Sequence, residues 1–307
     1  MRVHGKGERR KDETASKCRR LTPRPADSPP LRFGERLTLT LGASIADLMR
    51  DPHVVSLTYV ATPSETTSFD KAAPIEGTID QFRFRLAGGE LRIEPTGHFG
   101  SIEEARLHVD RILESWEIDI ALRFGNPELS FTYRTSEVVD RDPPPPGTRQ
   151  IVMVATAGEL SLVGSATLHV SRTRYPEPPT NFRASPDVLT LWKRYQGYRQ
   201  GREPLPSMAY FCLTFLQASA GGRDNAAREF KISSSVLNRI GRLTSERGDE
   251  GTARKYAAIK SGAPLTPSET RWLEEAVKAI IRRVGEFEAI DTLQPLDLAD
   301  LPSLESV

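Results

Sequence analysis

The stretch that decides the fold runs from Phe82 to Ile93 and reads FRFRLAGGELRI. Apolar residues alternate with polar ones on both sides of Gly88-Gly89, which is the pattern of two β-strands joined by a glycine turn. A strand that alternates in this way buries one face of an antiparallel sheet and exposes the other. The sequence therefore predicts a β-hairpin that covers a hydrophobic core.

A single strong helix follows the hairpin. Ser101 and Glu104 have the spacing of a capping box, and apolar residues then recur at helical intervals as far as Ile120. Alternation resumes over 129–133, and the runs 151–155 and 160–170 predict two more strands. We expect an α+β domain with a mostly antiparallel sheet and one long helix.

The second half of the chain has the periodicity of helices. Ser185-Pro186 opens one helix, and Thr266–Glu269 is a capping box that opens the last one. That last helix has a charged face, which we expect to point outward and to include Lys278 and Arg283. The segment from Leu205 to about Ser219 is apolar nearly all round, and such a helix must be surrounded by others. The sequence predicts an all-α helical bundle centred on this segment.

These changes divide the chain into five parts: a disordered basic arm (1–32), an α+β domain (33–174), a linker (175–184), a helical domain (185–287) and an acidic tail (288–307). The net charge is +1, but the arm has 10 Lys/Arg against 4 Asp/Glu, the helical domain 17 against 11, and the tail 0 against 5. Opposite charges on joined segments favour docking on each other or on separate partners. We expect the leucine-bearing tail either to dock on the helical surface or on another protein, or to stay disordered.

Cysteine usage and hydropathy indicate the compartment. The chain has two cysteines: Cys18, and Cys212 inside an apolar run where we expect an inert core thiol. The arginine pairs near the N-terminus are not followed by the apolar stretch of an export signal. No apolar run reaches the length of a membrane-spanning helix. We therefore expect a cytoplasmic protein without membrane contact.

Residues 225–242 resemble a helix-turn-helix. Ala227, Ile232, Leu237 and Ile240 fall where that motif has small or apolar residues. Lys231 departs from it, because such turns usually have glycine there. The candidate nucleic-acid contacts are Ser234, Ser235, Asn238, Arg239, Arg242 and Arg247. From the sequence alone we prefer two packed helices of an ordinary bundle, with DNA binding as the alternative.

Catalytic motifs are incomplete. All five histidines precede Thr173, and His98 and His108 lack the i, i+4 spacing of a helical metal pair. A solvated helix face explains the four acidic residues Asp110, Glu114, Glu117 and Asp119. We predict no catalytic, cofactor-binding or metal-binding residues and no cofactor, and we favour a protein that is not an enzyme. A metal-dependent hydrolase or nuclease remains the second alternative.

The helical half resembles a known accessory protein. The segments LWKRY (191–195) and PLPSMAYF (204–211), together with the final helix, are similar to accessory protein J encoded with methylamine dehydrogenase. The resemblance covers the last third of the chain. It implies a part in methylamine degradation, within one-carbon metabolism, whose biochemical role is undefined. Because that dehydrogenase works in the periplasm, a cytoplasmic protein would affect its expression or its precursors.

We therefore expect a two-domain, non-enzymatic accessory or interaction protein associated with methylamine utilisation. Its expected partner is a protein whose identity the sequence does not give. The alternative is a regulator that binds DNA through residues 225–242.

Overall fold

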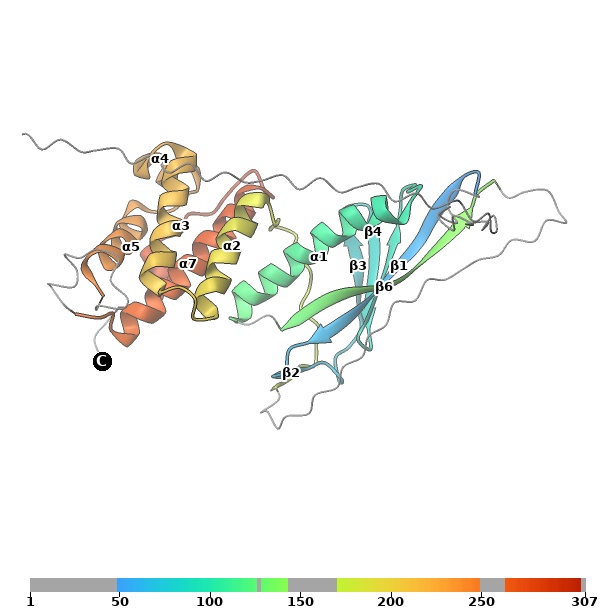
Figure 1. The fold of residues 1–307 in the computed structure, drawn as a ribbon, viewed down its shortest axis with the longest axis horizontal. Helices are drawn as coiled ribbons and strands as arrows, with labels where there is room; N and C mark the ends of the chain where they lie inside the picture. The colour runs from blue at the N-terminus through green and yellow to red at the C-terminus, as the bar shows by residue number, and fades with distance from the viewer. Residues whose placement is uncertain (1–48, 126–127, 143–169, 249–262, 305–307) are drawn as a thin grey trace, which may run out of the picture. The chain divides into compact units, whose positions relative to one another are not determined.

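The computed structural model describes residues 49–125, 128–142, 170–248 and 263–304. Within these ranges an antiparallel sheet with one long helix is followed by several helices, which confirms the α+β prediction (Figure 1). The expected strands at 151–155 and 160–170 lie outside the described residues, except for Val170. In the part of the chain that is described, no helix is both long and apolar enough to cross a bilayer.

The main sheet has the strand order β3-β4-β5-β1-β6, and every neighbouring pair is antiparallel. The predicted hairpin is β4 and β5, with Leu86 opposite Leu91 and both turn glycines at positive φ. A separate two-residue parallel pair joins β2 and β7. The strands are β1 (Pro52–Pro63), β2 (Thr67–Ser68), β3 (Ile75–Ile79), β4 (Phe82–Ala87), β5 (Glu90–Pro95), β6 (Leu129–Asp140) and β7 (Val170–Ser171).

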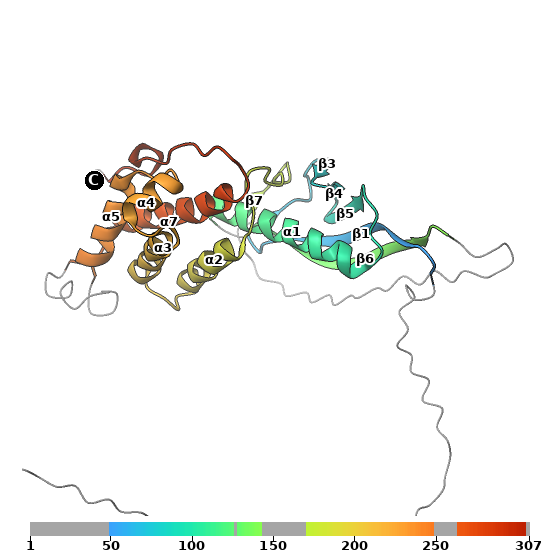
Figure 2. The ribbon, with the colours of Figure 1, turned by 90° about the horizontal axis from the view of Figure 1, so that it is seen from above.

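Helix α1 (Ile102–Phe124) covers one face of this sheet (Figures 1 and 2). Its N-cap is Ser101, whose hydroxyl accepts a hydrogen bond from the Glu104 backbone N at 3.1 Å, which is one of the two bonds of the predicted capping box. Val109 and Trp116 are fully buried against the apolar side of the strands. The Trp116 ring packs edge-on against Phe84. The alternating residues of the hairpin therefore find their core beneath α1.

The remaining helices pack around α3, the apolar segment. It contacts α2, α4, α5 and α7, and its Cys212 and Leu213 are fully buried. The capping box at Thr266 and Glu269 forms as predicted. The helices are α2 (Pro186–Arg199), α3 (Leu205–Ala220), α4 (Arg223–Glu229), α5 (Ser234–Glu246), α7 (Pro267–Phe287) and the 3₁₀ turn Leu298–Asp300.

The last third of α1 also belongs to the core of the helices. Ile118 and Leu122 are buried among the residues of α2, α3 and α7. Asp119 between them is completely buried, and its carboxylate pairs with Arg123 on the same helix and with Arg282 on α7. Burial raises the pKa of Asp119, against the opposing pull of the two guanidinium groups. The expectation that Asp119 lies on a solvated face is therefore wrong, because α7 covers this part of α1.

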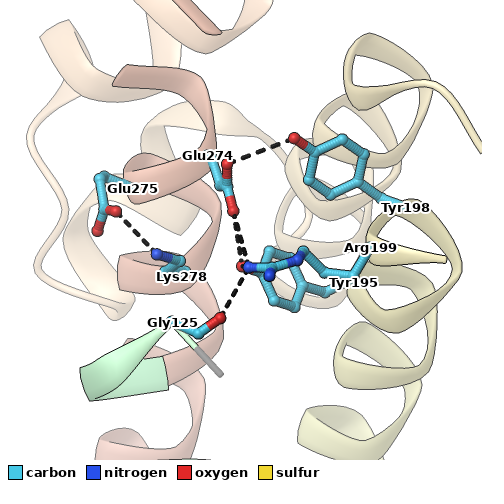
Figure 3. Close-up of polar contacts among 7 residues, drawn as sticks. All are labelled: Gly125, Tyr195, Tyr198, Arg199, Glu274, Glu275 and Lys278. Atoms are coloured by element: carbon cyan, nitrogen blue, oxygen red, sulfur yellow. Dashed lines mark hydrogen bonds and ion pairs between the residues drawn. The ribbon is translucent and has the colours of Figure 1, made fainter. Parts of the chain in front are cut away.

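A polar cluster joins the end of α1 to α2 and α7 (Figure 3). Arg199 donates to the Gly125 carbonyl oxygen at 2.7 Å, at the negative end of the α1 dipole. Tyr195 and Tyr198 both donate to the Glu274 carboxylate, at 2.9 and 3.3 Å. One carboxylate and one guanidinium thus fix the C-terminus of α1 against two helices.

Two residues predicted for the outer charged face of α7 lie inside instead. Arg283 and Lys278 are 7% and 9% exposed. Arg283 donates to the backbone carbonyl oxygen of Gln294 in the C-terminal tail. Lys278 pairs with Glu275 at 2.8 Å. The tail and the end of α1 cover positions that helical periodicity alone assigns to solvent.

Gly285 tests the packing of the segment 175–184 on α7. A Cβ at Gly285 would lie 2.3 Å from the Phe182 ring and 3.0 Å from the Arg183 carbonyl oxygen. We expect Gly285→Ala to lower the free energy of unfolding by about 1–3 kcal/mol. Gly197→Ala is the matched control, because it is also helical but has only ordinary contacts. It should raise stability by up to about 1 kcal/mol. Chemical denaturation measures both, and equal effects would contradict the tight packing of Phe182 on α7.

Candidate nucleic-acid interface

The turn between α4 and α5 contains one residue in the left-handed conformation, at the position where a helix-turn-helix usually has glycine. Helix α4 ends at Glu229, and after its C-cap Phe230 the residue Lys231 lies in the left-handed region at φ 51°. The Ile232 backbone N donates to the Ala227 carbonyl oxygen at 3.0 Å. This is the Schellman arrangement, whose left-handed position usually has glycine. Lys231, the residue that departs from the motif in sequence, therefore adopts the conformation that the motif requires.

The apolar positions of the motif face the helical core. Of the predicted positions, Ile232, Leu237 and Ile240 are at most 1% exposed and belong to the cluster built around α3. Ala227 is only half-buried, and its neighbour Ala226 lies in the core instead. Because this set packs inward, the opposite side of α5 faces outward.

Four of the six candidate contacts share that outward side. Ser234, Ser235, Asn238 and Arg242 are exposed, and Ser234, Asn238 and Arg242 follow each other at intervals of four residues along α5. No hydrogen bond or ion pair of Arg242 occurs within the described ranges. Hydroxyl, amide and guanidinium groups in such a row can reach base edges and phosphates.

The other two candidates are placed differently. Arg239 is half-buried, its guanidinium 5.7 Å from the centre of the Trp272 ring, and it lines a shallow cavity of about 540 Å³ beside the C-terminal tail. Arg247 donates to the Glu269 carboxylate at 2.9 Å. Although burial opposes it, the Thr266 backbone N and Arg247 hold the pKa of Glu269 below its usual range. Arg239 and Arg247 are thus engaged within the protein.

A fourth arginine near this surface was not among the predicted contacts. Arg223, the first residue of α4, donates to Asn238 Oδ1 at 2.9 Å. With the Gln217 amide oxygen facing it, the same guanidinium also donates to Gln217 at 3.0 and 3.1 Å. A Cβ at Gly241 would lie 3.1 Å from the guanidinium. Arg223 therefore lies close against α5 and is held at three points, a contact that sequence spacing does not reveal.

The C-terminal tail docks beside the turn. Leu296 forms a parallel bridge with Ile232, with the Ser233 backbone N donating to the Leu296 carbonyl oxygen at 2.9 Å. Leu296 and Leu301 are buried in the helical core. Of the alternatives left open for the tail, docking on the helical domain is the one that this segment adopts. The tail fixes the start of α5.

The catalytic alternatives gain little from the structure. The expected core position of Cys212 is confirmed, and burial raises the pKa of its thiol to about 12. Sequence spacing did not predict that His53 and His98 lie together, but their Nδ1 atoms are 3.2 Å apart. Burial, then His98 and Arg141, lower the pKa of His53. Among the residues that the structure describes, no group of three or more His, Cys, Asp or Glu side chains could hold a metal ion.

Comparisons with protein-family models, curated proteins and solved structures found no match to this chain.

Lys231 provides a test of the turn. A left-handed conformation costs a residue with a Cβ about 1–2 kcal/mol, and glycine avoids this cost. We expect Lys231→Gly to raise the free energy of unfolding by about 1 kcal/mol and Lys231→Val to lower it. Thermal or urea unfolding measures both. A destabilised glycine variant with an unaffected valine variant would show that Lys231 is not left-handed.

Proposed function

We propose that the chain is a non-enzymatic DNA-binding protein that places α5 in the major groove. The observation that carries the proposal is the combination of a left-handed turn at Lys231 with a recognition face of Ser234, Ser235, Asn238 and Arg242. Left-handed helix ends and exposed polar faces also occur in ordinary bundles, so the weight lies on their combination at the spacing of a helix-turn-helix. The preference for an ordinary bundle, which rested on sequence alone, therefore gives way to the DNA-binding alternative.

The arrangement of α3, α4 and α5 supports the same proposal. In helix-turn-helix domains the second helix of the motif reads base edges while neighbouring helices hold it from behind. Here α3 contacts both α4 and α5. The 17 Lys/Arg against 11 Asp/Glu of residues 185–287 supply the positive charge that draws such a domain to phosphates. We place the protein in the cytoplasm, where it would have access to DNA.

Arg242 and Arg271 provide a matched test. Both are exposed arginines, the first on the recognition face and the second on the outer side of α7. Duplexes selected from a random pool by the wild-type chain serve as ligand. Arg242→Ala should weaken binding about tenfold or more and reduce its salt dependence, because one charged contact is lost. Arg271→Ala should change affinity less than about twofold, in line with a charge outside the interface.

Titrations at several salt concentrations measure these effects. Equal losses for the two variants would mean that net charge, and not the face of α5, governs binding. Failure of the wild-type chain to enrich any duplex would contradict the proposal itself.

We further propose that the accessory role in methylamine utilisation, expected from the resemblance of the helical half, is exerted through this interface. A DNA-binding protein in the cytoplasm would act on expression of the dehydrogenase genes and not on the exported enzyme.

A deletion strain of the source organism tests the link. We expect it to grow poorly on methylamine as sole nitrogen source, to grow normally on ammonium, and to have altered dehydrogenase transcript levels. Complementation with the Arg271→Ala chain should restore growth, whereas Arg242→Ala should not. Normal growth of the deletion strain on methylamine would separate the protein from this pathway and leave the DNA-binding proposal standing.

A further inference from the structure

Asn238 is the central polar residue of the recognition face, and an asparagine in the major groove can read more than one base. With both its oxygen and its nitrogen available, its amide pairs with adenine, accepting from N6 and donating to N7. With only its nitrogen available, it donates to acceptors such as guanine O6 and N7. Which atoms are available therefore decides the base.

The contact with Arg223 settles the orientation of this amide. A guanidinium group can only donate hydrogen bonds, so the atom of Asn238 that lies 2.9 Å from Arg223 must be the carbonyl oxygen. The amide nitrogen is the end left to donate to a base. The second lone pair of the oxygen remains beside a positive group, which disfavours a further N–H donor such as adenine N6.

The Arg223 guanidinium has a second partner besides Asn238. Gln217, near the end of α3, accepts from Nε and Nη2, while Nη1 serves Asn238. The guanidinium occupies space that the missing side chain of Gly241 leaves open, because a Cβ at position 241 would lie 3.1 Å from Arg223 Nη2. Three elements, α3, α4 and α5, thus hold one donor group against the recognition face.

Arg242 adds a second donor on the same face. It is exposed, one turn beyond Asn238, and a guanidinium pairs best with the O6 and N7 acceptors of guanine. Asn238 and Arg242 together present donors along this face of α5. The major-groove edge that offers two acceptors from one base is that of guanine.

We infer that Asn238 reads guanine and that Arg223 is the positioning residue that sets this preference. The inference rests on the proposed function, since it assigns the base specificity of the same surface. It predicts a binding site with guanine opposite Asn238.

Selection from duplexes with a randomised centre tests the inference. The base read by residue 238 is the position at which Asn238→Ala loses its preference. We expect guanine there for the wild-type chain, with about tenfold weaker binding when adenine replaces it. Arg223→Met frees the amide oxygen and should erase this preference or turn it toward adenine.

Arg228→Met is the matched control, because it removes the same charge from α4 without touching α5. In the wild-type chain, Arg228 hydrogen-bonds only to Asn225 among the described residues. The control should keep the guanine preference even if its overall affinity falls. Gly241→Ala, which crowds the guanidinium, offers a second variant should Arg223→Met fold poorly, and it should weaken the preference in the same direction.

The outcomes separate the two proposals. Selection of adenine by the wild-type chain, or an unchanged guanine preference in both Arg223→Met and Gly241→Ala, would overturn the role of Arg223 and leave DNA binding intact. Absence of any selected sequence would overturn both.

Discussion

The need to enclose α3 is the constraint on which the helical half depends. Helix α3 is apolar on most sides, and α2, α4, α5 and α7 each present apolar residues to it, while its Phe211 and Phe215 remain half-buried. Helix α5 contributes Val236, Leu237 and Ile240 to this purpose. Its remaining face is then polar and exposed. The proposed DNA-reading surface is thus a direct consequence of how α3 is buried.

Helix α1 extends this core toward the sheet. The first half of α1 packs against the antiparallel strands. Ile118 and Leu122, in its last turns, pack in the core of the helical bundle. Arg282 pairs with the buried Asp119 of α1 and also donates to the Glu286 carboxylate. Glu286 pairs in turn with Arg283, which donates to the tail residue Gln294. A short series of ion pairs on α7 therefore connects α1 to the C-terminal segment that contacts the start of α5. The two halves share contacts that neighbouring domains on a free linker would lack.

Local patterns predicted the elements well because their causes are local. Two-residue alternation gave the β4–β5 hairpin, and the capping residues Ser101 and Thr266 marked the starts of α1 and α7. The expected apolar positions Ile232, Leu237 and Ile240 are buried, whereas Ala227 is half-buried and Ala226 takes the core position. Charged residues beside an apolar stripe were less predictable: Asp119 and Arg283 are buried because a second element covers them, and no spacing within one helix reveals such a neighbour. The contacts of Arg223 with Gln217 and Asn238 could not be predicted for the same reason, because the turn between α3 and α4 brings these residues together.

The most direct test of the central claim is a nuclear magnetic resonance titration of the labelled chain with a selected duplex. The account predicts that amide shifts concentrate on the exposed face of α5, at Ser234, Ser235, Asn238 and Arg242, with small changes on the sheet. Shifts confined to the sheet or to the outer side of α7, with α5 unchanged, would contradict the placement of α5 in the major groove.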